Sequence, residues 1–245
     1  MRRSYRIAGT VAATLAAAAA GVAATSGSAT AAGVAKSKYQ AAMKAAEAQN
    51  VHYVSTATEQ GISLEVVADT GKTSGSQTLE VQKGSTTEEL SVVLIGKTGY
   101  VRGNVSALES VLGLTAAQSS SYENRWLSFP TSTGSLSELV SGLLDSEVAP
   151  ELEMTGPYTF GGTKVIGGHL TQAIKGTAAS SSGTKVPIVL YVESSGTPRP
   201  VQEITNPNAK SSDIRATVTF SNWGEVTHPV APARSVPLVP LLPAS

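Results

Sequence analysis

Histidine, serine and acidic residues are the side chains of this sequence that could carry out catalysis. His52, His169 and His228 stand far apart, and none has the spacing of a metal ligand set. A serine hydrolase could combine His169 with a carboxylate and one of many serines, because triads are assembled in space. No nucleophile elbow, zinc-protease helix, Walker loop or dinucleotide fingerprint is present. The pattern therefore favours a protein without catalysis, cofactor or metal, and a hydrolase is the less favoured alternative.

Paired glycines and paired acidic residues could instead bind a ligand. The glycines at 161–162 and 167–168 could cradle a phosphate only if a helix began behind them, whereas the sequence continues as strand. Hairpin turns or bulges are the favoured interpretation. The acidic pairs 88–89 and Glu151/Glu153 could hold a cation, but their position near loops favours solvated charge.

The elements that must position these residues are mainly strands. Residues 36–49 are rich in strong helix formers, with Tyr39, Met43 and Ala46 along one face, and predict a first helix. Short segments rich in Val, Ile, Leu and Thr follow, separated by Gly, Ser and Lys clusters typical of antiparallel strands. The expected strands are 52–59, 63–70, 76–83, 90–95, 99–102, 153–160, 163–166, 169–177, 187–194, 200–205 and 213–221.

The alternation within these segments predicts which side chains turn inward. In the segment 213–220, Ile214, Ala216, Val218 and Phe220 alternate with polar or small residues, so one face is buried and the other is wet. The segments 77–82 and 187–193 alternate in the same way. A sheet with one apolar face needs a cover.

Two helices are expected in the middle of the chain to provide that cover. Ser106 and Ser135 are each followed three residues later by a glutamate, the spacing of a capping box, and each runs into a leucine-rich segment. The segments 119–121, 180–183 and 194–198 are expected as exposed loops. The predicted architecture is α+β: a curved antiparallel sheet, or half-barrel, whose concave face is covered by helices.

Two aromatic residues and the tail complete the pattern. Trp126 and Trp223 are expected to close the ends of the core. The segment 229–245 contains five prolines, which should deny it helix and ladder hydrogen bonds. We therefore expect a polyproline-like strap or a disordered end.

The first 31 residues have the layout of a signal peptide. Arg2, Arg3 and Arg6 precede the uncharged stretch 7–24, and Ala29 and Ala31 have the spacing of a cleavage site. An uncleaved anchor is the alternative. Cleavage would leave 15 basic and 18 acidic residues and no cysteine. That composition predicts one extracytoplasmic domain, 32–228, with a tail, no disulfides and no affinity for nucleic acid.

Several segments together resemble the LppX/LprG (LprA, LprF) envelope proteins of actinobacteria, relatives of the LolA and LolB lipoprotein carriers. These segments are Val51-His-Tyr-Val54, Lys97-Thr-Gly-Tyr100-Val-Arg102, Arg125-Trp126-Leu127 and the final strand Thr217-Val-Thr-Phe220-Ser-Asn-Trp223-Gly224-Glu225. The resemblance implies a LolA-like half-barrel that carries lipids or acylated glycolipids in an apolar cavity. We also expect a monomer that could contact a membrane surface.

The sheet residues expected to face such a cavity are apolar, and two leucines are expected to act as its lid. The cavity set is Leu64, Val66, Leu79, Val81, Val92, Leu94, Leu190, Val218 and Phe220, and the lid residues are Leu139 and Leu143. The family is typically anchored through a lipidated cysteine, which this sequence lacks, so a released carrier is expected. A secreted interaction or cell-wall module with a solid core remains the alternative.

Overall fold

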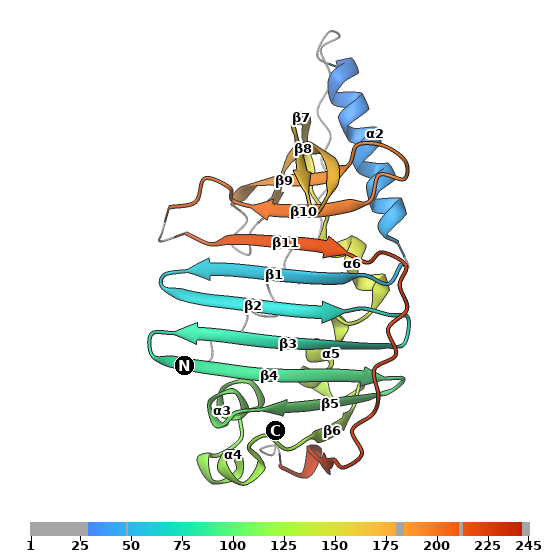
Figure 1. The fold of residues 1–245 in the computed structure, drawn as a ribbon. Helices are drawn as coiled ribbons and strands as arrows, with labels where there is room; N and C mark the ends of the chain where they lie inside the picture. The colour runs from blue at the N-terminus through green and yellow to red at the C-terminus, as the bar shows by residue number, and fades with distance from the viewer. Residues whose placement is uncertain (1–28, 48, 180–183, 211–212, 242–245) are drawn as a thin grey trace.

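The fold is built on one large open sheet (Figure 1). The computed structural model describes residues 29–47, 49–179, 184–210 and 213–241, so most of the expected signal segment, and the expected loop 180–183, lie outside the described residues. Twelve strands follow the order β12-β6-β5-β4-β3-β2-β1-β11-β10-β9-β8-β7. Every neighbouring pair is antiparallel except β12 and β6. The predicted half-barrel fold class is confirmed.

The strand bounds follow the alternating segments of the sequence closely. The strands are β1 His52–Glu59, β2 Ile62–Asp69, β3 Ser74–Lys83, β4 Thr86–Ile95, β5 Thr98–Gly103, β6 Leu127–Pro130, β7 Thr155–Ile166, β8 His169–Ala179, β9 Lys185–Glu193, β10 Pro200–Thr205, β11 Arg215–Ser221 and β12 Val236–Pro237.

Tight turns connect the long strands, and glycine supplies the backbone conformation that they need. Gly167 and Gly168 have φ of 57° and 85° and form the two-residue turn between β7 and β8. Both central residues of a type I′ hairpin require positive φ, which costs glycine little. Gly161 and Gly162 lie where the β7 register shifts between Phe160 and Thr163. The interpretation of both glycine pairs as turns or bulges is confirmed, and β7 is one irregular strand, not the two that were expected.

Helices cover one face of the sheet. The structure has α2 Ala29–Ala46, α3 Val105–Leu112, α4 Ala116–Tyr122, η1 Gly134–Ser137, α5 Glu138–Ser141, α6 Asp145–Glu151 and η2 Val239–Leu241. In Figure 1, α5 and α6 lie behind the strands, and α3 and α4 lie at the end of the sheet formed by β5 and β6. The cover therefore consists of α2 and several very short helices.

The helix starts in the middle of the chain differ from those predicted. The Asn104 side chain, not Ser106, caps α3 by accepting from the Ala107 amide at 3.0 Å. The capping box that the structure contains joins Thr115 and Gln118 at the start of α4. Residues 119–121, expected as a loop, therefore belong to a helix. The segment expected to form a helix from Ser135 is broken into η1 and the four-residue α5.

The C-terminal tail runs along one end of the strands, from β11 toward β6, as a strap (Figure 1). The Val236 amide donates to the Trp126 carbonyl at 2.9 Å, and the Leu238 amide donates to the Ser128 carbonyl at 2.9 Å. The expectation that prolines deny the tail ladder hydrogen bonds was wrong, because the prolines alternate with residues that keep a free N–H. Leu238 is fully buried, so the tail completes the core as far as Leu241.

Candidate functional site

The predicted cavity residues of the sheet all lie on its helix-covered face, and the two predicted lid residues, Leu139 and Leu143, come from α5 and the segment after it. Leu64, Val66, Leu79, Val92, Leu94, Leu143, Leu190 and Phe220 are buried, and Val81, Leu139 and Val218 are partly buried against them. The strand register brings the nine sheet residues together, because alternate residues of each strand point to the same side. Their contact with a lipid stays a prediction. They divide into two clusters of the core, which differ in chemistry.

The lower core lies between β2–β6 and the short helices α3 and α5. Phe129, Leu94 and Leu143 are among its largest buried side chains, and Leu238 of the tail joins them. The packing is tight: a Cβ added to Gly99 would lie 2.4 Å from the Phe129 ring, and one added to Gly75 would lie 2.7 Å from the Leu143 carbonyl oxygen. The protein's own side chains therefore fill the space between the sheet and the short helices in this half.

The upper core lies between β8–β11 and helices α2 and α6. Ile174, Leu190 and Phe220 contribute from the sheet. Tyr39 of α2 reaches over to the segment after α6, where its hydroxyl donates to the Leu152 carbonyl at 3.3 Å and accepts from the Met154 amide at 2.9 Å. Two buried hydrogen bonds through one phenol thus tie α2 to the chain that leaves α6.

Carboxyl groups are buried in this upper half. Glu203 of β10 is 6% exposed. Its Oε1 accepts from the Thr205 hydroxyl at 3.3 Å, and its Oε2 has no hydrogen-bond partner among the described residues. Glu151, the last residue of α6, also has a buried Oε2 that lacks a described partner. The two carboxyl groups are close enough to affect each other electrostatically.

Burial controls the protonation of this pair. Desolvation raises the pKa of Glu203 to about 7, although the Thr205 hydroxyl lowers it. Desolvation, together with the negative charges of Glu147 and Glu203, raises the pKa of Glu151 to about 8. Burial also raises the pKa of Tyr53, whose ring lies between the two clusters, to about 12. The expectation that Glu151 is solvated was wrong, since α6 turns it inward while Glu153 stays exposed.

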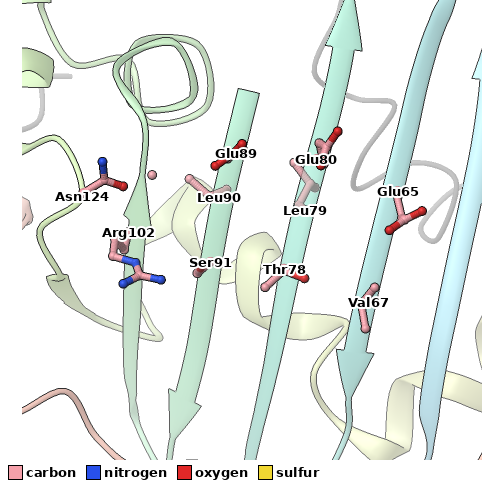
Figure 2. A pocket seen from close by; sticks show the side chains of 11 residues that line it. Glu65, Val67, Thr78, Leu79, Glu80, Glu89, Leu90, Ser91, Arg102 and Asn124 are labelled. Atoms are coloured by element: carbon pink, nitrogen blue, oxygen red, sulfur yellow. The ribbon is translucent and has the colours of Figure 1, made fainter. Parts of the chain in front are cut away.

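A hollow lies on the opposite face of the sheet (Figure 2). It has a volume of about 240 Å3. Glu65, Glu80 and Glu89 stand directly opposite one another on β2, β3 and β4, and Arg102 lies on the next strand. A second, shallow hollow of about 440 Å3 lies at the β6 edge beside Phe129 and Pro237. Neither is lined by residues of α2, α5 or α6.

Two of the histidines considered for catalysis pair with carboxylates on neighbouring strands. His169 Nδ1 lies 3.0 Å from Glu193 Oε1, and His52 Nδ1 lies 2.9 Å from Asp69 Oδ1. The described contacts of His169 include this carboxylate but no serine hydroxyl. Within the same residues, no group of three or more histidine or acidic side chains could hold a metal ion.

The two tryptophans have different environments. Trp223 packs against the upper core and donates to the Pro200 carbonyl at 2.8 Å, as predicted. Trp126 instead lies beneath the Arg102 guanidinium, 5.0 Å from its ring centroid. Its expected place in the core was wrong, because its neighbour Leu127 occupies the inward position on β6.

The overall arrangement matches a solved structure. LprF from Mycobacterium bovis superposes with a TM-score of 0.56 at 18% identity, over 81% of this chain and 97% of that protein. The chain has the fold of LprF. The lipoprotein LppX from Mycobacterium tuberculosis gives a TM-score of 0.49 at 17% identity, over 80% of this chain and 98% of LppX. No family model matches the sequence, and no curated protein matches it. The match to LprF confirms the predicted resemblance to LppX/LprG proteins at the level of the fold.

Proposed function

We propose that this protein binds lipid outside the cytoplasm and carries it on the helix-covered face of the sheet. The observation that carries the proposal is the face itself: one apolar surface continues across most of the sheet and is covered mainly by short helices. The LprF-like fold supports it. Lipids or acylated glycolipids are the expected cargo.

Lipid binding by this face requires the helices to move, and α6 is the element best suited to move. Its N-cap residue Leu144 makes no side-chain capping bond, and Pro150 lies inside the helix. A helix of seven residues has little stability of its own. Its last residue places a carboxyl group in an apolar setting, which opposes close packing. An acyl chain that enters beneath α6 gains about 0.8 kcal/mol for each methylene group buried.

The proposed carrier acts without catalysis and as a monomer, and its binding energy comes from apolar contact. Export by the signal segment 1–31 would place it outside the cytoplasm. Within the described residues no helix is both long and apolar enough to span a membrane. A secreted interaction module with a solid core is the second candidate, which the tight packing around Gly75 and Gly99 favours.

Native mass spectrometry of protein recovered by mild extraction tests the proposal. A carrier should retain lipid, seen as added mass that organic solvent removes. Val218, half-buried on the helix-covered face, is the position for a blocking variant. Val218→Trp should abolish the added mass, because an indole fills the space that a chain would need.

The matched control is Thr217→Trp, which places the same indole one residue earlier on the opposite face of β11. It should leave bound lipid unchanged. Wild-type protein that carries no lipid, and takes up none from mixed micelles, contradicts the proposal and leaves the solid-core module.

A further inference from the structure

Apolar side chains are exposed at the tip of the β7–β8 hairpin. Val165 is 63% exposed and Leu170 is 56% exposed, and the two residues are directly paired across the hairpin. Phe160, farther down β7, is also exposed. Single exposed apolar residues are ordinary on a protein surface, but a cluster on one projecting element indicates an interaction site.

The start of helix α2 lies beside this tip and adds to the same surface. The Lys38 ammonium donates to the Ser194 carbonyl at 3.4 Å, and the Ser194 amide donates to the Leu170 carbonyl at 2.9 Å. Val34 is four residues before Lys38, so both project from the same side of α2. Val34 is exposed. We call Val34, Val165 and Leu170 the apolar tip, and Lys38 lies beside it.

Basic residues surround the apolar tip. Lys36 is exposed on the other side of α2 from Val34 and Lys38. Lys164 is exposed on the other face of the hairpin from Val165, where its ammonium lies 5.7 Å from the Tyr191 ring centroid. The Glu193 carboxylate lies 3.0 Å from His169 Nδ1. Positive charge therefore predominates around these exposed apolar side chains.

From this juxtaposition we infer that the apolar tip is a docking site for an anionic lipid surface. Apolar side chains enter the boundary between headgroups and acyl chains, and each nearby lysine or arginine adds about 1 kcal/mol of attraction to anionic headgroups. A partner protein that added a strand to β7 would require a regular edge. The β7 register is broken twice, between Thr155 and Thr159 and between Phe160 and Thr163, which disfavours strand addition.

Co-sedimentation with vesicles tests this inference. The protein is recovered from the producing cell with its own N-terminus, read by intact mass, and each variant is recovered in the same way. Wild-type protein should bind phosphatidylglycerol/phosphatidylcholine vesicles and bind pure phosphatidylcholine at least about tenfold more weakly, with the difference shrinking as salt rises. Val165→Ser together with Leu170→Ser should weaken binding to anionic vesicles by about tenfold or more.

Three further variants locate the effect, of which the first and the third are controls. Val230→Ser changes a residue that is 84% exposed on the C-terminal strap and should leave vesicle binding unchanged. Lys36→Gln with Lys164→Gln should remove most of the preference for anionic vesicles, whereas Lys72→Gln with Lys83→Gln should not.

Equal binding by wild type and the Val165/Leu170 variant, or no binding by either, overturns the docking site. The cargo proposal is tested separately, because the Val165/Leu170 variant keeps the helix-covered face intact and should still carry lipid in native mass spectra. Loss of docking with cargo retained supports the inference, and loss of cargo alone bears only on the proposed function.

Discussion

The two halves of the helix-covered face differ in the side chains that they bury. In the lower core, Phe129, Leu94 and Leu143 pack against glycines that leave no room for a Cβ. In the upper core, tyrosine hydroxyls and the carboxyl groups of Glu151 and Glu203 are buried among apolar side chains. Close packing stabilises the first half, whereas the second half holds polar groups whose burial costs free energy.

This difference assigns different roles to the two halves. A well-packed cluster resists opening because every displaced side chain loses its contacts. Buried carboxyl groups without full sets of hydrogen bonds lower the cost of separating the surfaces that bury them. We therefore expect the lower core to act as the rigid support and the region beneath α6 to open first.

The largest effect is expected in the lower core, at the contact between Gly99 and Phe129. Phe129→Ala should reduce the free energy of unfolding by about 4 kcal/mol because it leaves a cavity. Gly99→Ala alone should cost about 2 kcal/mol, because its Cβ would overlap the Phe129 ring. In the Phe129→Ala protein, Gly99→Ala should cost almost nothing. Denaturant unfolding of the four proteins measures this coupling, and additive effects would show that the contact is not tight.

The next effect is expected in the upper core and depends on pH. The pKa of Glu203 rises from 4.5 to about 7 on folding, so the folded state holds this proton more tightly than the unfolded state. Its contribution is therefore greatest below pH 4.5 and is lost as pH rises to about 7, a change of about 3 kcal/mol. Glu203→Gln should remove this part of the pH dependence and stabilise the protein at pH 8 while changing little at pH 4.5.

Thermal or denaturant unfolding between pH 4 and pH 9 provides the measurement. Glu109→Gln, at an exposed position on α3, is the matched control and should retain the wild-type dependence. If Glu203→Gln also retains the wild-type pH dependence, the pKa of Glu203 is not raised by burial, and the proposed difference between the two cores is contradicted.

A smaller effect should follow from loosening α2 in the same half. Tyr39→Phe removes the acceptor of the Met154 amide and the donor to the Leu152 carbonyl. It should cost about 1 to 2 kcal/mol, because buried backbone groups lose their partner. Amide exchange at Met154 should accelerate, while exchange at Val92 in the lower core should not. Tyr100→Phe is the control, since that hydroxyl has no hydrogen-bond partner among the described residues, and an equal loss there would remove the distinction.

Much of the sheet could be predicted from the sequence, because alternation fixes both a strand and the face it buries. The expected segments 52–59 and 200–205 coincide with β1 and β10. The inward positions of Leu79 and Val218 are also confirmed. Ile214, expected on the same buried face as Val218, is instead 41% exposed, because it precedes the first residue of β11. A period of two residues over six or more positions is a strong local signal.

The parts that could not be predicted depend on contacts between distant segments. Helix α6 is short and contains Pro150, so its periodicity is too weak to identify. Strand β12 has two residues and exists only because β6 supplies a parallel partner. The carboxyl groups of Glu151 and Glu203 come from segments far apart in sequence, and only the packing of α6 on the sheet brings them near each other. In the sequence, Glu151 and Glu153 form one acidic pair, and nothing there shows that Glu151 turns inward while Glu153 stays exposed.

The smallest effect concerns the opposite face, where the two halves also differ. Glu65, Glu80 and Glu89 form a row of like charges in the lower half, whereas the same row continues through Thr56 and Thr217 in the upper half. Like charges directly opposite on neighbouring strands are destabilising. Glu80→Gln should therefore raise the free energy of unfolding by about 0.5 kcal/mol at low salt, and the gain should shrink at 1 M salt.

Exposed Glu109 on α3 provides the control for this row, because Glu109→Gln removes the same charge without changing the sheet. It should have a smaller effect at low salt. A stabilising effect of Glu80→Gln that persists at high salt would point to side-chain packing instead of repulsion. In that case the outer face of the lower half would share the close packing of its inner face, and the charge difference between the halves would have no energetic consequence.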